Sequence, residues 1–96
     1  MIAFAHGLID RAAGAELRRL RLAAGLSQSA VARRMATHKP LIGRAEHGVH
    51  CPSLALCASQ AEACGGSIYD VLHAVDVALG LAGAGVPVRR RVSARA

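Results

Sequence analysis

The chain has 96 residues, carries a net charge of +6 and contains only two aromatic residues, Phe4 and Tyr69. This length allows one domain with one small core and excludes a second domain. Eleven of the twelve basic residues are Arg, the side chain best suited to bind phosphate and guanine. The charge therefore suits a polyanionic partner, although many small basic proteins bind no nucleic acid.

The cysteine count and the apolar segments bear on the location of the protein. An odd number of cysteines, here Cys51, Cys57 and Cys64, favours reduced thiols and a cytoplasmic protein. The apolar start of the chain lacks the basic segment and the long apolar run of a signal peptide. The longest apolar stretch, residues 77–88, is too short and too rich in glycine to span a membrane, so we expect no membrane association.

Helical spacing of apolar residues predicts an all-α chain, and no strand pattern competes with it. The first periodic segment begins by about Asp10 and ends at Gly25, a residue suited to the turn that closes a helix. Ser27 is a good N-cap for a second helix over residues 28–35, which would bury Val31. We therefore expect a short helix directly after a longer one.

Three more helices follow in the remaining sequence. The third is expected over residues 39–47, because Pro40 falls in the first turn, where a helix tolerates proline, and Gly48 ends the pattern. Ser53 begins a fourth helix that Gly65 ends. The fifth helix has one apolar face that is long for so small a core. This face comprises Ile68, Val71, Leu72, Val75 and Leu79.

These elements divide the chain into three parts. Residues 1–13 are expected to form a partly helical extension, residues 14–79 the helical domain, and residues 80–96 a flexible tail rich in glycine and arginine. The tail holds four arginines and no acidic residue, so it can add phosphate contacts that do not depend on sequence.

The second and third helices are joined by a three-residue break, residues 36–38. This arrangement is typical of the helix-turn-helix motif, whose second helix enters the major groove of DNA. Ala32 is small, as a close helix crossing requires, and Ala36 stands where such turns often carry glycine. By pattern alone the signal is moderate, because helical hairpins are common.

The gap-free run from Leu17 to Leu72 resembles the Cro/repressor helix-turn-helix family, also called the xenobiotic-response-element family. The matching residues are Arg21, Gly25-Leu26-Ser27-Gln28, Ala32, Ile42, Glu46, Gly48, Pro52-Ser53-Leu54 and Gly65. The resemblance implies a five-helix, lambda-repressor-like domain that binds double-stranded DNA through its third helix and regulates transcription, most simply as a repressor. Gln60 departs from the family, because relatives usually place an aliphatic core residue there.

The resemblance implies a role for each residue at the matching positions. Gln28 would touch a phosphate from the start of the second helix, and Lys39 would begin the recognition helix. Arg44 could donate two hydrogen bonds to guanine O6 and N7. An ion pair between Arg21 and Glu46 would be structural and would keep the Glu46 charge away from DNA phosphates.

The rest of the expected recognition surface is chemically sparse. His38 stands at the helix N-cap in place of the more common Ser or Thr, and Pro40 offers only apolar contact, for example to a thymine methyl. Gly43 would lie on the exposed face and bring the backbone close to the groove, and His47 ends the same helix. Few polar side chains indicate modest specificity or reliance on DNA shape.

Cys57 and Cys64 lie seven residues apart on one face of the fourth helix, where family members commonly have Leu, so we expect small core residues. The alternative is a metal or redox site that also uses His47, His50 and Cys51. The spacing contains no CxxC pair, so we expect no metal and no cofactor.

An enzyme is not expected, because the chain has no nucleophile-base-acid set, phosphate loop or paired carboxylates. The rival interpretation is a protein-interaction module, such as an antitoxin or a bridging factor, that uses the same fold to bind a protein partner. The long apolar face of the fifth helix suits that role and equally suits a homodimer. The segment 27–45, with a charge of +4 and no acidic residue, could also be an ordinary solvated surface.

Overall fold

The computed structural model describes residues 2–49 and 52–81, with side chains from residue 7 onward. Within these residues it contains five helices and no strand: α1 Ile2–Ala23, α2 Gln28–Arg34, α3 Lys39–Glu46, α4 Leu54–Ala63 and α5 Ile68–Leu81. The expected all-α, five-helix class is confirmed. The tail from residue 82 onward, with its arginines, lies outside the described residues, as do His50 and Cys51.

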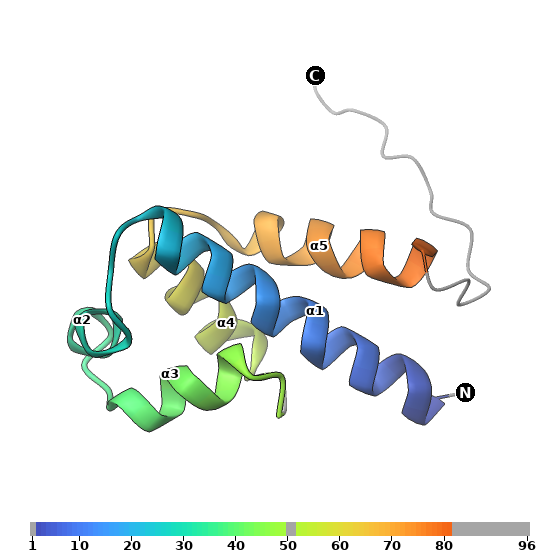
Figure 1. Ribbon diagram of the computed structural model, residues 1–96, viewed down its shortest axis with the longest axis horizontal. Coiled ribbons are helices and arrows are strands. Elements are labelled where there is room, and N and C mark those ends of the chain that lie inside the picture. Colours follow the sequence, from blue (N-terminus) through green and yellow to red (C-terminus); the bar gives the residue numbers. More distant parts are fainter. Residues whose placement is uncertain (1, 50–51, 82–96) are drawn as a thin grey trace, which may run out of the picture.

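Helix α1 is longer than the periodic segment that starts near Asp10, because it begins at Ile2. It crosses the middle of the molecule, with α5 along one side and α3 along the other (Figure 1). Ile9 and Ala13 of α1 line one groove together with Leu72 and Val75 of α5. The early part of α1 therefore belongs to the packed domain, where it covers much of the long apolar face of α5.

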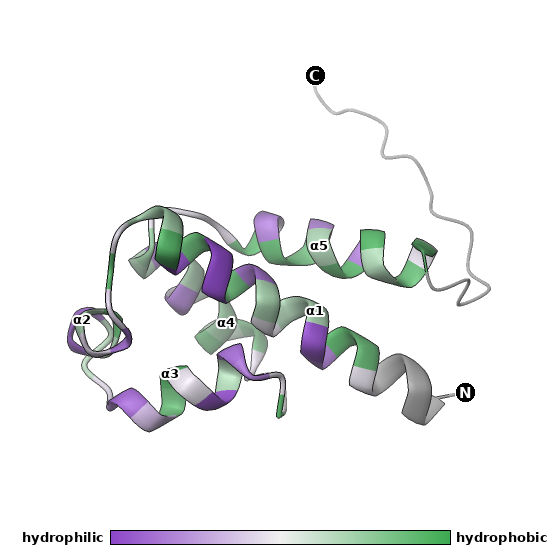
Figure 2. Ribbon diagram, viewed as in Figure 1, coloured by the Kyte–Doolittle hydropathy of each residue, from purple (hydrophilic) through white to green (hydrophobic). Residues whose placement is uncertain are grey.

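The core lies where the first three helices meet α4 and α5. Its largest fully buried side chains are Leu17, Val31 and Ile42, one each from α1, α2 and α3. Small residues fill much of the remaining core, which lets the helices pack closely. These are Ala13, Ala32, Ala45, Cys57, Ala61 and Cys64. Figure 2 shows that α5 is hydrophobic over most of its length, whereas hydrophilic residues dominate α2 and both ends of α3.

The helix ends follow the predicted signals closely. Ser27 Oγ accepts a hydrogen bond from the Ala30 N–H at 3.0 Å, and Ser53 Oγ accepts one from the Leu56 N–H at 3.2 Å. Both serines are thus N-caps, of α2 and α4. Helix α5 continues to Leu81, so the start of the expected tail is helical.

Candidate nucleic-acid interface

The connection between α2 and α3 has helix-turn-helix geometry. Ala36 has a φ of 56°, in the left-handed region that glycine favours. The Thr37 N–H donates to the Ala32 carbonyl at 2.9 Å, and the Ala36 N–H donates to the Arg33 carbonyl at 3.1 Å. These bonds close the end of α2 in the manner of a left-handed cap. They fix the direction in which the chain enters α3.

Helix α3 buries one side and exposes the other. Ile42, Ala45 and Glu46 are buried. The exposed residues are His38, Lys39, Pro40, Arg44 and His47. This side has two basic residues, and the one acidic residue of the helix is buried, so the described surface of α3 is positively charged. The His38 side chain makes no capping hydrogen bond, and His47 Nδ1 lies 2.8 Å from the Gly43 carbonyl oxygen.

Gly43 is half-buried, contrary to the expectation that it lies on the exposed face. The carboxamide of Gln28 covers it: a Cβ built on Gly43 would lie 3.5 Å from Gln28 Oε1. Gln28 is held there because its Nε2 donates to Glu46 Oε1 at 3.1 Å. The first residue of α2 is therefore tied to the recognition helix.

Arg21 and Glu46 form a buried ion pair between α1 and α3. Arg21 Nε donates to Glu46 Oε2 at 2.6 Å and Nη2 donates to Oε1 at 2.9 Å, the bidentate geometry that suits guanidinium and carboxylate. Arg21 Nη1 also donates to the Leu26 carbonyl at 2.9 Å. The hydrogen bonds to Glu46 raise the pKa of Arg21 above its usual value. The pair neutralises the carboxylate closest to the recognition surface.

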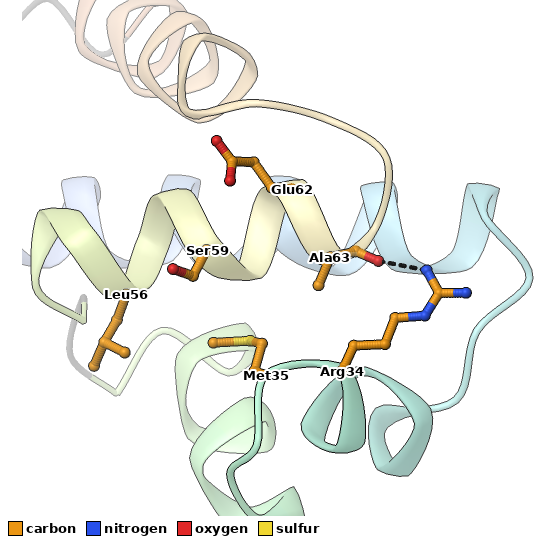
Figure 3. Close-up of a pocket in the computed structure, with 6 residues that line it drawn as sticks. All are labelled: Arg34, Met35, Leu56, Ser59, Glu62 and Ala63. Atoms are coloured by element: carbon orange, nitrogen blue, oxygen red, sulfur yellow. Dashed lines mark hydrogen bonds between the residues drawn. The ribbon is translucent and has the colours of Figure 1, made fainter.

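One of the four basic residues of the segment 27–45, Arg34, makes an exposed contact with another helix of the same chain. Figure 3 shows Arg34 reaching from α2 to the end of α4, where Nη1 donates to the Ala63 carbonyl at 2.8 Å. A cation at this point donates a hydrogen bond to a terminal carbonyl and interacts favourably with the negative, C-terminal end of the α4 dipole. The exposed basic residues of the recognition helix itself are Lys39 and Arg44.

Two glycines allow α1 to approach the end of α3. Gly14 is buried, and a Cβ there would lie 2.8 Å from the Glu46 carbonyl oxygen and would clash with the Ala45 carbonyl oxygen. Gly48 has a φ of 71°, and its Cβ would lie 2.9 Å from Arg11 Cα. The two backbones therefore touch, which side chains would prevent. Gly14 had no predicted role, although an isolated glycine that does not end a helical pattern is a recognised signal of close packing.

The apolar face of α5 is largely used inside the domain. Val71 is 2% exposed and belongs to the core, so the prediction that it is available for dimer contacts is wrong. Ile68 and Val75 are half-buried against the same core, and Leu79 is also half-buried. Leu72 remains 48% exposed. Val71 is buried, contrary to the prediction, because the early part of α1 covers this face of α5.

The interior also holds two cysteines and a glutamine. Cys57 and Cys64 are buried in the core, which confirms the prediction, and burial raises the pKa of the Cys64 thiol. In the described part of the chain, which omits His50 and Cys51, no cluster of three or more His, Cys, Asp or Glu side chains could hold a metal ion. Gln60 is 2% exposed, and its Nε2 has no hydrogen-bond partner among the described residues.

No described helix is long and apolar enough to cross a membrane.

Comparison with known proteins identifies the motif. No curated protein and no solved structure matches the chain. A family described as a helix-turn-helix domain matches residues 12–74, which is 63 of the 96 residues and includes α2, the turn, α3 and the Arg21–Glu46 pair. The chain therefore belongs to this helix-turn-helix family of DNA-binding domains.

Proposed function

We propose that the chain is a sequence-specific regulator of transcription, a repressor, that inserts α3 into the major groove of double-stranded DNA. The observation that carries this proposal is the exposed side of α3, which presents Lys39 and Arg44 and no exposed carboxylate. A helix of this kind fits the major groove, where each base pair shows a distinct pattern of donors and acceptors. Repression then requires only that the bound protein occupies the operator.

Arg44 is the residue that we assign to base recognition. It is exposed, and it follows Pro40 by one helical turn, so the two lie on the same side of α3. Its guanidinium can donate to guanine O6 and N7, a contact worth about 1–3 kcal/mol of discrimination. His38, Lys39 and His47 flank this position and suit contacts to phosphates or base edges.

The test compares Arg44→Ala with Arg90→Ala on two duplexes, one enriched by the wild-type protein and one of random sequence. Arg44→Ala should lose the preference for the enriched duplex. Arg90, in the basic tail, should affect both duplexes to the same extent when it is replaced. Equal loss on both duplexes for Arg44→Ala would remove Arg44 from base recognition, and thermal unfolding of each variant controls for folding.

We also propose that two copies of the chain pair through a groove between α1, α4 and α5. The groove has a volume of about 270 Å³ and a nearly apolar lining that includes Ile9, Leu54, Leu72 and Val75. Leu54 is 68% exposed and Leu72 is 48% exposed, so each copy presents exposed leucine side chains at the edge of an apolar groove. A two-fold contact needs this self-complementary combination on one surface.

Sedimentation of Leu72→Glu tests the pairing. At roughly tens of micromolar, where contacts of moderate affinity form, the wild type should sediment as a dimer and the variant as a monomer. Tyr69→Glu is the matched control, because Tyr69 is 76% exposed on α5 and does not line the groove. A wild-type monomer, both with and without DNA, would contradict the proposal.

The same groove supports a second candidate function, which is binding of another protein as an antitoxin or a bridging factor does. Exposed apolar patches beside a polar surface are typical of such contacts. In that case the α3 surface need not discriminate between sequences. The absence of any sequence enriched by the wild-type protein would favour this function over DNA recognition.

A further inference from the structure

The structure describes eight arginine and lysine side chains, and they differ in whether the fold uses their charge. Three of them, Arg19, Arg21 and Arg34, donate hydrogen bonds to other groups of the chain. The other five form no hydrogen bond or ion pair with any described residue, and two of these five lie on α1 rather than on α2 or α3. A guanidinium without a partner in the chain can bind an anion of another molecule. The five are Arg11, Arg18, Arg33, Lys39 and Arg44.

Arg11 and Arg18 lie beside the contact between α1 and α3. Gly14 marks this contact, because a Cβ there would lie 2.8 Å from the Glu46 carbonyl oxygen. Arg11 precedes Gly14 by three residues and Arg18 follows it by four, so both are its neighbours on the helix surface. A Cβ on Gly48, just after α3, would lie 2.9 Å from Arg11 Cα. The two exposed arginines therefore flank the line along which α1 crosses the end of the recognition helix (Figure 1).

The other exposed side of α1 faces α5 and has a different charge balance. Arg19 lines a cleft there together with Asp70, and its Nε donates to Glu16 at 2.9 Å. On the side of α3, the nearby carboxylate is that of Glu46, which is buried and paired with Arg21. A phosphate would therefore meet carboxylates beside α5 and uncompensated positive charge beside α3.

The dimensions of DNA bring phosphates to the sides of an inserted helix. The major groove is about 12 Å wide, and a helix with its side chains is about 10–12 Å across, so the DNA backbones run close along the helix. Because α1 packs against the end of α3, long basic side chains that flank this contact are well placed for a backbone that borders the groove.

We propose that Arg11 and Arg18 form a phosphate-binding site on α1, which holds the DNA backbone beside the groove that α3 occupies. The site rests on one part of the proposed function, the insertion of α3 into the major groove, and it acts on DNA of any sequence. Arg11 lies before residue 12, where the match to the helix-turn-helix family begins, so this part of the site is an addition to the family domain.

Binding to a random duplex at several salt concentrations tests the site with Arg11→Ala, Arg18→Ala and Arg19→Ala. Each phosphate contact contributes about 0.9 to the slope of the logarithm of affinity against the logarithm of salt concentration, which is about 5-fold in affinity at about 0.15 M salt. Arg11→Ala and Arg18→Ala should each lower the slope by about 0.9 and weaken binding by about 5-fold, equally on the random and the enriched duplex. Arg19→Ala removes the same charge from the neighbouring position and should leave the slope unchanged.

Thermal unfolding of each variant controls for folding. The proposal is overturned if Arg18→Ala and Arg19→Ala change the slope equally, because only the net charge would then matter, or if neither Arg11→Ala nor Arg18→Ala changes it. The expected slopes, together with no motif enriched by the wild type, would support the phosphate site and refute sequence recognition. A wild type that binds no duplex would refute both.

Discussion

Gln60 places an amide in the core, where none of the residues that the structure describes partners its nitrogen. The side chain is 2% exposed, and its Nε2 has no hydrogen-bond partner among the described residues. A buried donor without a partner costs about 1–3 kcal/mol, because it has lost its hydrogen bonds to water. Methionine has a similar length and volume and no N–H, so it can fill the same space without that cost. We therefore expect Gln60→Met to stabilise the fold by about 1–3 kcal/mol.

Urea unfolding followed by circular dichroism measures this change. The midpoint should rise while the slope stays unchanged, and the thermal midpoint should rise by about 4–8 °C per kcal/mol in a domain of this size. Ser59→Met at the exposed neighbouring position is the control, and it should change stability by less than about 0.5 kcal/mol. A Gln60→Met variant that is less stable than the wild type would refute the reasoning, since it would show that the amide is bonded in solution.

Three further substitutions address the framework that holds α3. Glu46→Ala leaves the Arg21 charge buried without its partner, so the free energy of unfolding, measured by urea titration, should fall by about 3–5 kcal/mol. A fall below about 1 kcal/mol would show that the pair is solvated. Gly14→Ala should force α1 away from α3 and lower both the thermal midpoint and the DNA affinity. Gly7→Ala is the control, and it should be neutral or slightly stabilising, because a Cβ there meets only the end of a flexible side chain. Equal effects of the two substitutions would contradict the close packing of α1 against α3. Burial raises the pKa of the Cys64 thiol, so the folded chain keeps this proton to higher pH than the unfolded chain. Stability should be intact below the ordinary cysteine pKa and fall as pH rises through the raised value, and Cys64→Ala should lack this alkaline loss.

Local sequence signals were sufficient to predict the elements that carry the motif. Ser27 and Ser53 are N-caps as expected, and the helical period correctly placed Ile42 inside and Arg44 outside. The start of α1 was not predictable in the same way, because its first residues are nearly all apolar and show no period. Ile9 and Ala13 pack beside α5, which makes this part of α1 belong to the domain, and Val71 is buried at the same contact.

Of the contacts between helices at the site, the Arg21–Glu46 pair was expected because the family resemblance implies it, and the others could not be predicted from the sequence. The bond from Gln28 to Glu46 and the approach of Gly14 to the end of α3 depend on how the helices cross. A periodic pattern specifies which side of each helix is buried and leaves the crossing angle open. For the same reason, the charge of Arg34 could be counted in the sequence, but its use at the end of α4 could not be foreseen.

The most direct test of sequence recognition by α3 is selection of bound DNA from a random duplex library at near-physiological salt. We predict that the wild-type protein enriches a palindromic motif, as a two-fold dimer requires, and that Arg44→Ala loses the preference for a guanine within it. No enrichment by the wild-type protein, with only salt-sensitive binding to all duplexes, would contradict sequence-specific recognition and favour a protein partner at the groove between α1, α4 and α5.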